Sequence, residues 1–199
     1  MDEIEIETPH GPARAHVDRA PTPAGTLVLG HGAGGGVEAV DIQAAAGVAR
    51  DAGFTVALVE QPYRVAGRKA PAHADQLDAA WEAVIAELRD RGLVAAPLVV
   101  GGRSLGARVA CRTSGAVRAD AVLCLAFPVH PPGKPEKSRM EELDAVKLPV
   151  LVVQGKSDPF GMPAAAKGRE VTVVTGNHGL KADLPAVSEA VRSWLGELG

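Results

Sequence analysis

Three residue types that together support nucleophilic catalysis follow three apolar runs of the chain. Ser104 lies in the GRSLG motif of residues 102–106, directly after the run PLVVGG. Asp158 follows the run PVLVVQG, and His178 follows EVTVVTG. A serine hydroxyl needs a base to become a good nucleophile, and a histidine base needs a carboxylate to orient it. The chain therefore supplies the parts of a serine-based acyl transfer, in the order serine, aspartate, histidine.

Each of the three residues also has a structural interpretation. Ser104 could cap a helix, Asp158 could be a turn residue before proline, and His178 could be a solvated loop histidine. The motif around Ser104 favours catalysis, because G-x-S-x-G between a strand and a helix makes a sharp turn that exposes the hydroxyl. We favour the catalytic interpretation since all three residues occupy loops that follow expected strands.

The glycine-rich segment LVLGHGAGGG (27–36) has two chemical interpretations. Gly30, Gly32 and Gly35 fit the G-x-G-x-x-G fingerprint of dinucleotide-binding loops, and Glu60 at the end of the next apolar run could hold a ribose. The same loop could donate backbone N–H groups to an oxyanion. We favour the oxyanion interpretation, because two strand-like segments precede the loop and the helical pattern begins late after it.

The elements that must position these residues alternate between short apolar runs and helical stretches. Such alternation predicts βαβ units, a parallel sheet buried on both sides, and sites beyond the carboxyl ends of its strands. Two N-terminal segments alternate instead between polar and apolar residues, which predicts an antiparallel edge. The expected strands are residues 3–7, 13–19, 26–30, 54–60, 97–102, 121–127, 149–155 and 170–176.

Four stretches between these runs have helical patterns. The expected helices are residues 38–52, 74–91, 105–117 and 184–198. The first should bury Val40, Ala44, Val48 and Ala52, and the second Leu77, Trp81, Val84 and Leu88. The expected fold class is therefore α/β, with a mostly parallel central sheet, an antiparallel N-terminal edge and helices on both faces.

Four motifs carry a resemblance to a known family: HGAGGG, GRSLG, QGKSDPFG and GNHG. With them, the chain from about Gly25 to its C-terminus resembles the small lidless branch of the α/β-hydrolase superfamily, near the dienelactone hydrolases. The segment FPVHPPGKPEKSR (127–139) is similar to a subgroup with testis-expressed relatives and a subunit of the non-specific-lethal chromatin complex. The resemblance implies an α/β-hydrolase fold without a large cap.

The resemblance also implies roles for the residues that match the motifs. Ser104 would be the nucleophile, His178 the general base and then acid, and Asp158 the residue that orients His178. The oxyanion would accept hydrogen bonds from the N–H of Leu105 and the N–H of Ala33, with Gly34 as the alternative.

Several other side chains near the expected strand ends could line a substrate site. Arg64, with the cations of segment 127–139, could attract an anionic substrate, although a solvated run of charges is the simpler interpretation. His31 is expected to shape the glycine loop rather than transfer protons. The candidates for substrate contact are His31, Tyr63, Arg64, Arg103, His130 and Phe160.

Composition narrows the function classes further. The chain has 199 residues, 46% hydrophobic residues and a net charge of −3, which favours a single domain over residues 1–199 and no nucleic-acid partner. The two cysteines are expected to be reduced, and no stretch reads as a signal peptide or a membrane span. We expect a cytoplasmic protein with no metal and no cofactor.

The sequence as a whole predicts a serine hydrolase that cleaves small ester-like substrates through an acyl-enzyme intermediate. A non-catalytic scaffold with the same fold, working in a protein complex, is the second interpretation, because a fold does not by itself determine a function. A dinucleotide-binding protein is the third. The oligomeric state is not predicted.

Overall fold

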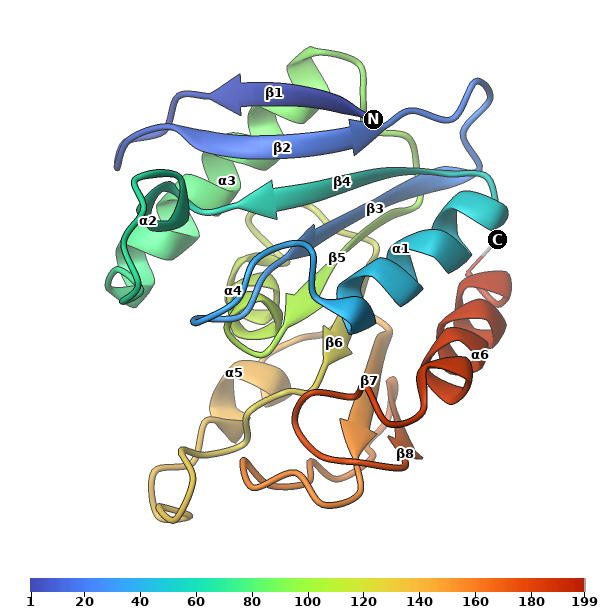
Figure 1. The fold of residues 1–199 in the computed structure, drawn as a ribbon. Helices are drawn as coiled ribbons and strands as arrows, with labels where there is room; N and C mark the ends of the chain where they lie inside the picture. Colours follow the sequence, from blue (N-terminus) through green and yellow to red (C-terminus); the bar gives the residue numbers. More distant parts are fainter. Residues whose placement is uncertain (199) are drawn as a thin grey trace.

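One β-sheet forms the centre of the structure, a computed structural model that describes residues 1–198 (Figure 1). Over these residues the sheet has eight strands, in the order β1-β2-β4-β3-β5-β6-β7-β8. The strands are β1 (Asp2–Ile6), β2 (Ala13–Asp18), β3 (Gly25–Gly30), β4 (Phe54–Glu60), β5 (Leu98–Arg103), β6 (Ala121–Leu125), β7 (Val150–Gly155) and β8 (Arg169–Val174).

The direction of the strands changes only at the N-terminal edge of the described sheet. β1 pairs antiparallel with β2, and β2 pairs antiparallel with β4. All pairings from β4 through β3 to β8 are parallel. The strand order reverses at β3, which lies between β4 and β5, and ligand sites of open α/β sheets form at such a reversal. The glycine loop follows β3 and Ser104 follows β5, so both start from this point.

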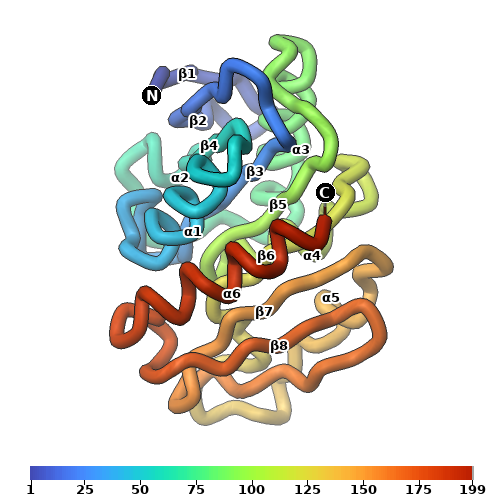
Figure 2. The backbone as a smooth tube through the Cα atoms, turned by 90° about the vertical axis from the view of Figure 1, so that its right-hand side faces the viewer, coloured from blue at the N-terminus to red at the C-terminus, as the bar shows by residue number. Residues whose placement is uncertain are grey.

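Helices cover both faces of the sheet. They are α1 (Val40–Asp51), α2 (Pro62–Val65), α3 (Ala74–Asp90), α4 (Leu105–Thr113), α5 (Met140–Asp144) and α6 (Leu184–Gly196). Side chains of the strands alternate between two cores, one shared with α3, α4 and α5 and the other with α1 and α6. Figure 2 looks onto the second face, where α6 crosses in front of the strands. The expected fold class is confirmed, and residues 1–198 build no large cap over the sheet.

The buried face of α1 matches the expected one at Val48 but not at its other three positions. Val40 is 48% exposed and Ala52 is exposed, whereas Ile42, Ala45 and Ala49 are buried. A spacing of four residues advances about 40° around a helix at each step, so a strict four-residue series drifts off one face. By contrast, all four residues expected to be buried on α3 are buried.

Other boundaries moved by a few residues. α4 ends at Thr113 rather than at residue 117, and β6 ends at Leu125, two residues before the end of its apolar run. The short helices α2 and α5 were not expected, because they are too short to show a helical period. No helix within residues 1–198 combines the length and the apolar character needed to cross a membrane.

Candidate active site

Ser104 stands at a tight turn between β5 and α4. Its backbone has φ +52° and ψ −104°, a region that residues other than glycine rarely adopt. A Cβ on Gly102 would come within 2.5 Å of the Gly30 carbonyl oxygen, and one on Gly106 within 2.4 Å of the same atom. The two glycines of the motif are therefore required by the close approach of β3, β5 and α4. The turn presents the Ser104 hydroxyl at the strand end.

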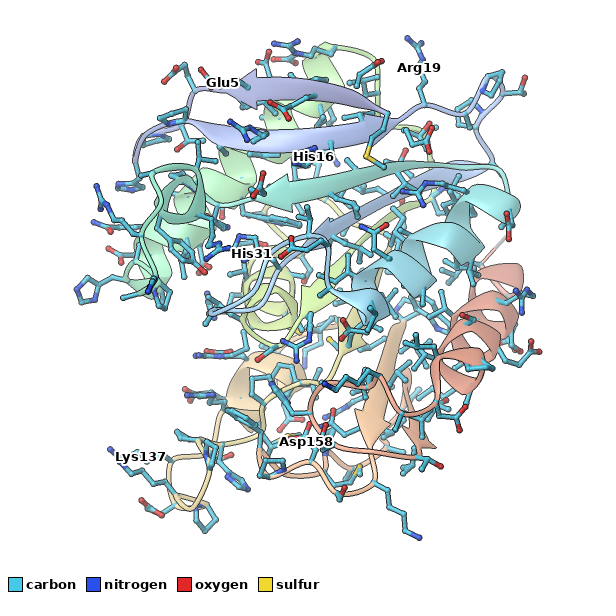
Figure 3. All side chains as sticks on the ribbon, in the orientation of Figure 1. Glu5, His16, Arg19, His31, Lys137 and Asp158 are labelled. Carbon is cyan, nitrogen blue, oxygen red and sulfur yellow. The ribbon has the colours of Figure 1, made fainter. Side chains whose placement is uncertain are left out.

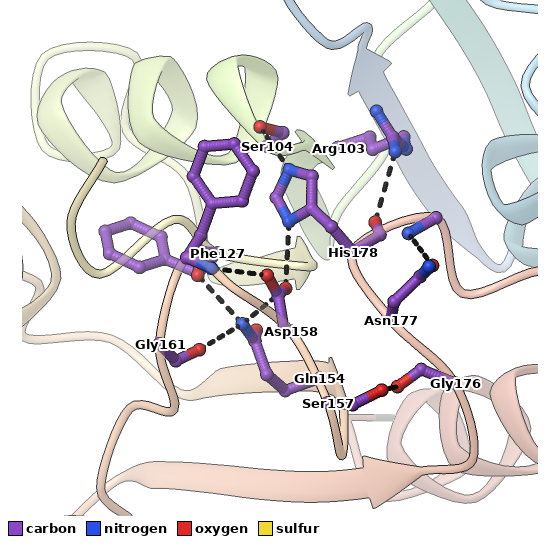
Figure 4. A network of polar contacts seen from close by, with 12 residues as sticks. Arg103, Ser104, Phe127, Gln154, Ser157, Asp158, Gly161, Gly176, Asn177 and His178 are labelled. Carbon is purple, nitrogen blue, oxygen red and sulfur yellow. Dashed lines mark hydrogen bonds and ion pairs between the residues drawn. The ribbon is translucent and has the colours of Figure 1, made fainter. Parts of the chain in front are cut away.

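The structure brings Ser104, His178 and Asp158 together in one hydrogen-bonded chain (Figure 4). The Oγ of Ser104 lies 2.9 Å from Nε2 of His178, and Nδ1 of His178 lies 2.8 Å from Oδ2 of Asp158. A carboxylate oxygen accepts hydrogen bonds, so Nδ1 carries the proton and Nε2 accepts from the serine hydroxyl. The His178 side chain is 15% exposed and that of Asp158 is 0% exposed. The imidazole thus links a buried carboxylate to a hydroxyl at the surface.

The Asp158 carboxylate is held by three N–H donors. Besides His178, the side-chain Nε2 of Gln154 lies 2.9 Å from Oδ2, and the backbone N–H of Phe160 donates to Oδ1 at 2.8 Å. The same Gln154 nitrogen lies 2.8 Å from the carbonyl oxygen of Gly161. Hydrogen bonds to the ionised form favour a carboxylate that would otherwise be costly to bury. The sequence analysis missed Gln154, although an amide in an otherwise apolar buried strand was a signal for it.

Phe160 packs against the imidazole of His178. The two rings stack with centroids 4.0 Å apart and an interplanar angle of 25°. Next to it, His130 donates from Nδ1 to the carbonyl of Pro131, and its backbone N–H donates to the Phe160 carbonyl. His130 and Phe160 therefore support the turn that carries Asp158. Phe160 is the one of these two that reaches His178.

The glycine loop is anchored through its carbonyl groups. Nδ1 of His31 donates to the Gly32 carbonyl at 2.8 Å, and Nε2 accepts from the backbone N–H of Gln61 at 3.1 Å. The hydroxyl of Tyr63 donates to the Ala33 carbonyl at 3.0 Å. Burial lowers the pKa of His31 and raises the pKa of Tyr63 to about 12, so both stay neutral at physiological pH. His31 is 2% exposed, so it shapes the loop and does not line an open surface.

These anchors decide where the loop's N–H groups point. In a trans peptide the N–H is directed opposite to the carbonyl of the same unit. Tying down the carbonyls of Gly32 and Ala33 therefore turns the N–H groups of Ala33 and Gly34 the other way. Within residues 1–198 these two N–H groups and that of Leu105 have no hydrogen-bond acceptor. They are the donors expected at an oxyanion site, at the start of α4 and in the loop after β3.

Arg103 differs from its expected place among substrate-lining side chains. Its Nε lies 3.0 Å from Oδ2 of Asp41, and its Nη2 donates to the carbonyl of His178 at 3.1 Å. The Arg103 side chain is 21% exposed, and both contacts engage its guanidinium with the protein itself. The carboxyl of Asp41 is 1% exposed, and burial raises its pKa while the nearby Arg103 charge opposes this shift. The sequence analysis missed Asp41, which gave no signal beyond being an acidic residue in a first helical turn.

The remaining cations are spread over different surroundings. Arg64 lies on α2, where its charge reaches His31 and Tyr63 and lowers the pKa of both, in each case as a smaller effect than burial. Lys134 and Lys137 are exposed on the loop 127–139, and Lys137 points outward from its tip (Figure 3). This loop therefore has the character of a solvated run of charges.

Two alternative site chemistries can be compared with the geometry. Glu60, which a dinucleotide site would need for a ribose, lies 2.9 Å from Nε2 of His16 and 3.8 Å from Nη1 of Arg14. α1 begins at Val40, ten positions beyond Gly30, so no helix N-terminus directly follows the glycines. Among residues 1–198, no group of three or more histidine, cysteine, aspartate or glutamate side chains could hold a metal ion.

Comparisons with known proteins agree with this architecture. A family model described as an alpha/beta hydrolase domain matches residues 23–183. A protein of Butyrivibrio proteoclasticus, also known with ferulic acid bound, has a TM-score of 0.80 and 16% identity, with 100% of this chain and 99% of that chain covered. A serine hydrolase without a lid from Xanthomonas campestris has a TM-score of 0.70 and 22% identity, with 97% and 94% covered. An esterase of Pyrococcus furiosus has a TM-score of 0.74 and 16% identity, with 99% and 88% covered.

Proposed function

The chain belongs to the α/β-hydrolase domain family, and on that premise we propose that it is a serine hydrolase that cleaves small ester-like substrates through an acyl-enzyme intermediate. One observation carries the proposal: Ser104, His178 and Asp158 form a hydrogen-bonded chain with separations of 2.9 and 2.8 Å. The N–H groups of Leu105, Ala33 and Gly34, which have no acceptor within residues 1–198, support it, because acyl transfer needs donors where negative charge develops. The narrower subgroup suggested by segment 127–139 stays a prediction.

The first half of the reaction acylates the serine. Ser104 Oγ attacks the carbonyl carbon while its proton passes to Nε2 of His178. The imidazolium that forms is stabilised by the buried Asp158 carboxylate at Nδ1. The carbonyl oxygen becomes an oxyanion that accepts hydrogen bonds from Leu105 N–H and from the N–H of Ala33 or Gly34. Collapse of this intermediate breaks the ester bond, and Nε2 returns the proton to the departing alcohol.

The second half releases the acid. A water molecule gives a proton to Nε2 of His178 and attacks the acyl carbon, and the same N–H groups hold the second oxyanion. When that intermediate collapses, the bond to Ser104 Oγ breaks and the proton returns to the serine. The net result is one water consumed, with one acid and one alcohol formed.

The open site favours small acyl groups. Residues 1–198 build no large cap that could enclose a long chain, and the Butyrivibrio relative binds the small aromatic acid ferulic acid. We expect acetate and butyrate esters to be hydrolysed faster than long-chain esters. A preference for long-chain esters, measured as kcat/KM across a series of acyl lengths, would contradict this expectation.

A fluorophosphonate probe tests the catalytic role directly. The wild-type protein should be labelled at Ser104, and Ser104→Ala should abolish labelling and lower kcat on the order of 10⁴-fold or more. Ser138→Ala is the matched control, because Ser138 is an exposed loop serine whose Oγ only accepts from the backbone N–H of Met140. A folded wild-type protein that is neither labelled nor active on any ester would instead support the non-catalytic scaffold.

A further inference from the structure

The side chain of Arg103 joins three segments that meet at the site. Its Nε pairs with Asp41 on α1 at 3.0 Å. Its Nη2 donates to the His178 carbonyl at 3.1 Å (Figure 4). Its Nη1 fills the space beside Gly32, where a Cβ would lie 2.8 Å away. Arg103 also immediately precedes Ser104 in the chain. Its backbone therefore leads into the turn of Ser104, while its side chain contacts the main chain of His178.

Asp41 supplies the buried negative charge that faces the Arg103 guanidinium. Its carboxylate is buried in the first turn of α1, where Oδ1 accepts from the backbone N–H of Ile42, and Oδ2 forms an ion pair with Arg103 Nε at 3.0 Å without a hydrogen bond. A buried carboxylate without a partner is strongly unfavourable, so Asp41 holds the guanidinium in place. A guanidinium is planar, so the ion pair at Nε and the hydrogen bond from Nη2 to the His178 carbonyl together limit how far the group can turn.

His178 needs support of this kind from its main chain. It lies in the connection between β8 and α6, and its ring is held on one side by Asp158 and by stacking with Phe160. Those contacts orient the ring, whereas the bond from Arg103 acts on the backbone that carries it. Proton transfer depends on the separation of Nε2 and Ser104 Oγ, and a displacement of about 1 Å can cost on the order of 10²-fold in rate.

We infer that Arg103 and Asp41 form a positioning pair, which fixes the backbone of His178 relative to Ser104 and thereby sets the geometry for proton transfer. The inference rests on the proposed function, since it assigns these residues to the support of the same site. Neither side chain touches the reacting atoms. They act by holding His178.

A second ion pair in the same part of the fold offers a comparison. Arg112 on α4 pairs with Asp78 on α3, with Nη2 and Oδ1 of the two residues 2.6 Å apart and Nε and Oδ2 2.8 Å apart. Arg112 also lies 3.3 Å from Glu142 on α5, so this pair joins helices of the fold and contacts none of the proposed catalytic residues. Its removal should affect stability without affecting His178, which makes it the matched control.

The test separates stability from activity by replacing the pair with apolar side chains. Arg103→Met alone strands a buried carboxylate and should lower Tm by roughly 10 °C. Adding Asp41→Leu removes that carboxylate, and Tm should return to within a few degrees of the wild type. The kcat of the double variant should stay on the order of 10- to 100-fold below wild type with KM little changed, because the His178 carbonyl has lost its donor.

The control double variant Arg112→Met with Asp78→Leu should keep the wild-type kcat. If the Arg103→Met, Asp41→Leu variant recovers both Tm and kcat, the pair is merely structural and the inference is overturned. Arg103→Lys covers the case in which the double variant does not fold. Lysine keeps the charge beside Asp41 but lacks the planar group that reaches two acceptors, so kcat should fall about tenfold while Tm changes little.

A readout that needs no turnover keeps this test independent of the proposed function. The Nδ1 proton of His178, bonded to Asp158, should give a far-downfield proton resonance in the wild-type protein. That resonance should broaden or vanish in Arg103→Lys and stay unchanged in the Arg112 and Asp78 control. An unaltered resonance in Arg103→Lys would overturn the inference. A wild-type protein that shows the resonance but fails to react with the probe would instead overturn the proposed function alone.

Discussion

The two sides of the proposed site are held in opposite ways. On the side of Asp158 and His178, side-chain donors and acceptors are paired with one another, and the carboxylate alone receives three N–H groups. On the side of the glycine loop, the carbonyls of Gly32 and Ala33 accept hydrogen bonds, while the N–H groups of Ala33 and Gly34 have no acceptor within residues 1–198. On the first side the hydrogen-bonding groups are saturated, whereas on the second side N–H donors are left without acceptors.

The difference follows from what each side would have to do. Groups that move a proton must keep one orientation through the reaction, so every partner that fixes them helps. Groups that stabilise a transient charge must be oriented in advance and still be free to bind it. Anchoring a peptide by its carbonyl satisfies both conditions, because it orients the N–H without occupying it. Damage to the saturated side should therefore cost more than damage to an anchor of the open side.

Among changes that compare the two sides, the largest effect is expected from Gln154→Met. Gln154 is 0% exposed, and the change removes the contacts of its Nε2 with Asp158 and with the carbonyls of Gly161 and Phe127 at almost constant volume. The Asp158 carboxylate loses a hydrogen-bond donor, and the turn that carries it loses the bond at Gly161. We therefore expect kcat to fall on the order of 10- to 100-fold with KM nearly constant. Steady-state kinetics on a short-chain ester measure this.

The control for Gln154→Met is a buried hydrogen bond far from the carboxylate. Thr113→Val removes the bond from a buried hydroxyl to the Val109 carbonyl and should lower Tm by a few degrees without changing kcat. Equal kcat values for the two variants would show that the function of Asp158 and His178 does not depend on the Gln154 amide.

A smaller effect is expected from Tyr63→Phe. The hydroxyl of Tyr63 anchors the Ala33 carbonyl, and its loss lets that peptide rotate while the N–H groups remain present. A hydrogen bond of this kind contributes about 1 kcal/mol, so kcat/KM should fall about three- to tenfold. A loss larger than that of Gln154→Met would reverse the comparison between the two sides.

The smallest effect is a titration at alkaline pH. Tyr63 is the single tyrosine of the chain, and burial raises its pKa to about 12, against about 10 in an unfolded chain. The folded protein keeps this proton where the unfolded chain releases it, so the stability it contributes is present below pH 10 and is lost as the pH rises toward 12. The phenolate absorbance should show a midpoint near 12 in the native protein. A native midpoint near 10 would mean that the anchor is exposed.

The sequence identified the parts of this molecule that local patterns encode. Short apolar runs followed by polar loops located the parallel strands, and their carboxyl ends predicted that Ser104, Asp158 and His178 lie near one another. The glycines at positions 102 and 106 predicted the tight turn at Ser104, because close backbone approach excludes a Cβ at both positions. Each of these features is readable within a few residues.

The supporting contacts are encoded differently. Asp41 meets Arg103, and Tyr63 meets Ala33, only after α1 and α2 pack at the strand ends. No spacing rule links such pairs, because their separation in the chain depends on the lengths of the connections between them. Gln154 is the exception, since its position in a buried apolar strand is visible in the sequence.

The left-handed backbone of Ser104 has a consequence for the evolution of the chain. Holding a residue with a Cβ at φ +52° costs about 1–3 kcal/mol, and glycine would relieve most of that cost. Selection for heat resistance alone would thus reward Ser104→Gly and eliminate the nucleophile. A lineage that retains serine at this position accepts a lower free energy of unfolding. Retention of the serine side chain therefore indicates that catalytic turnover is under selection.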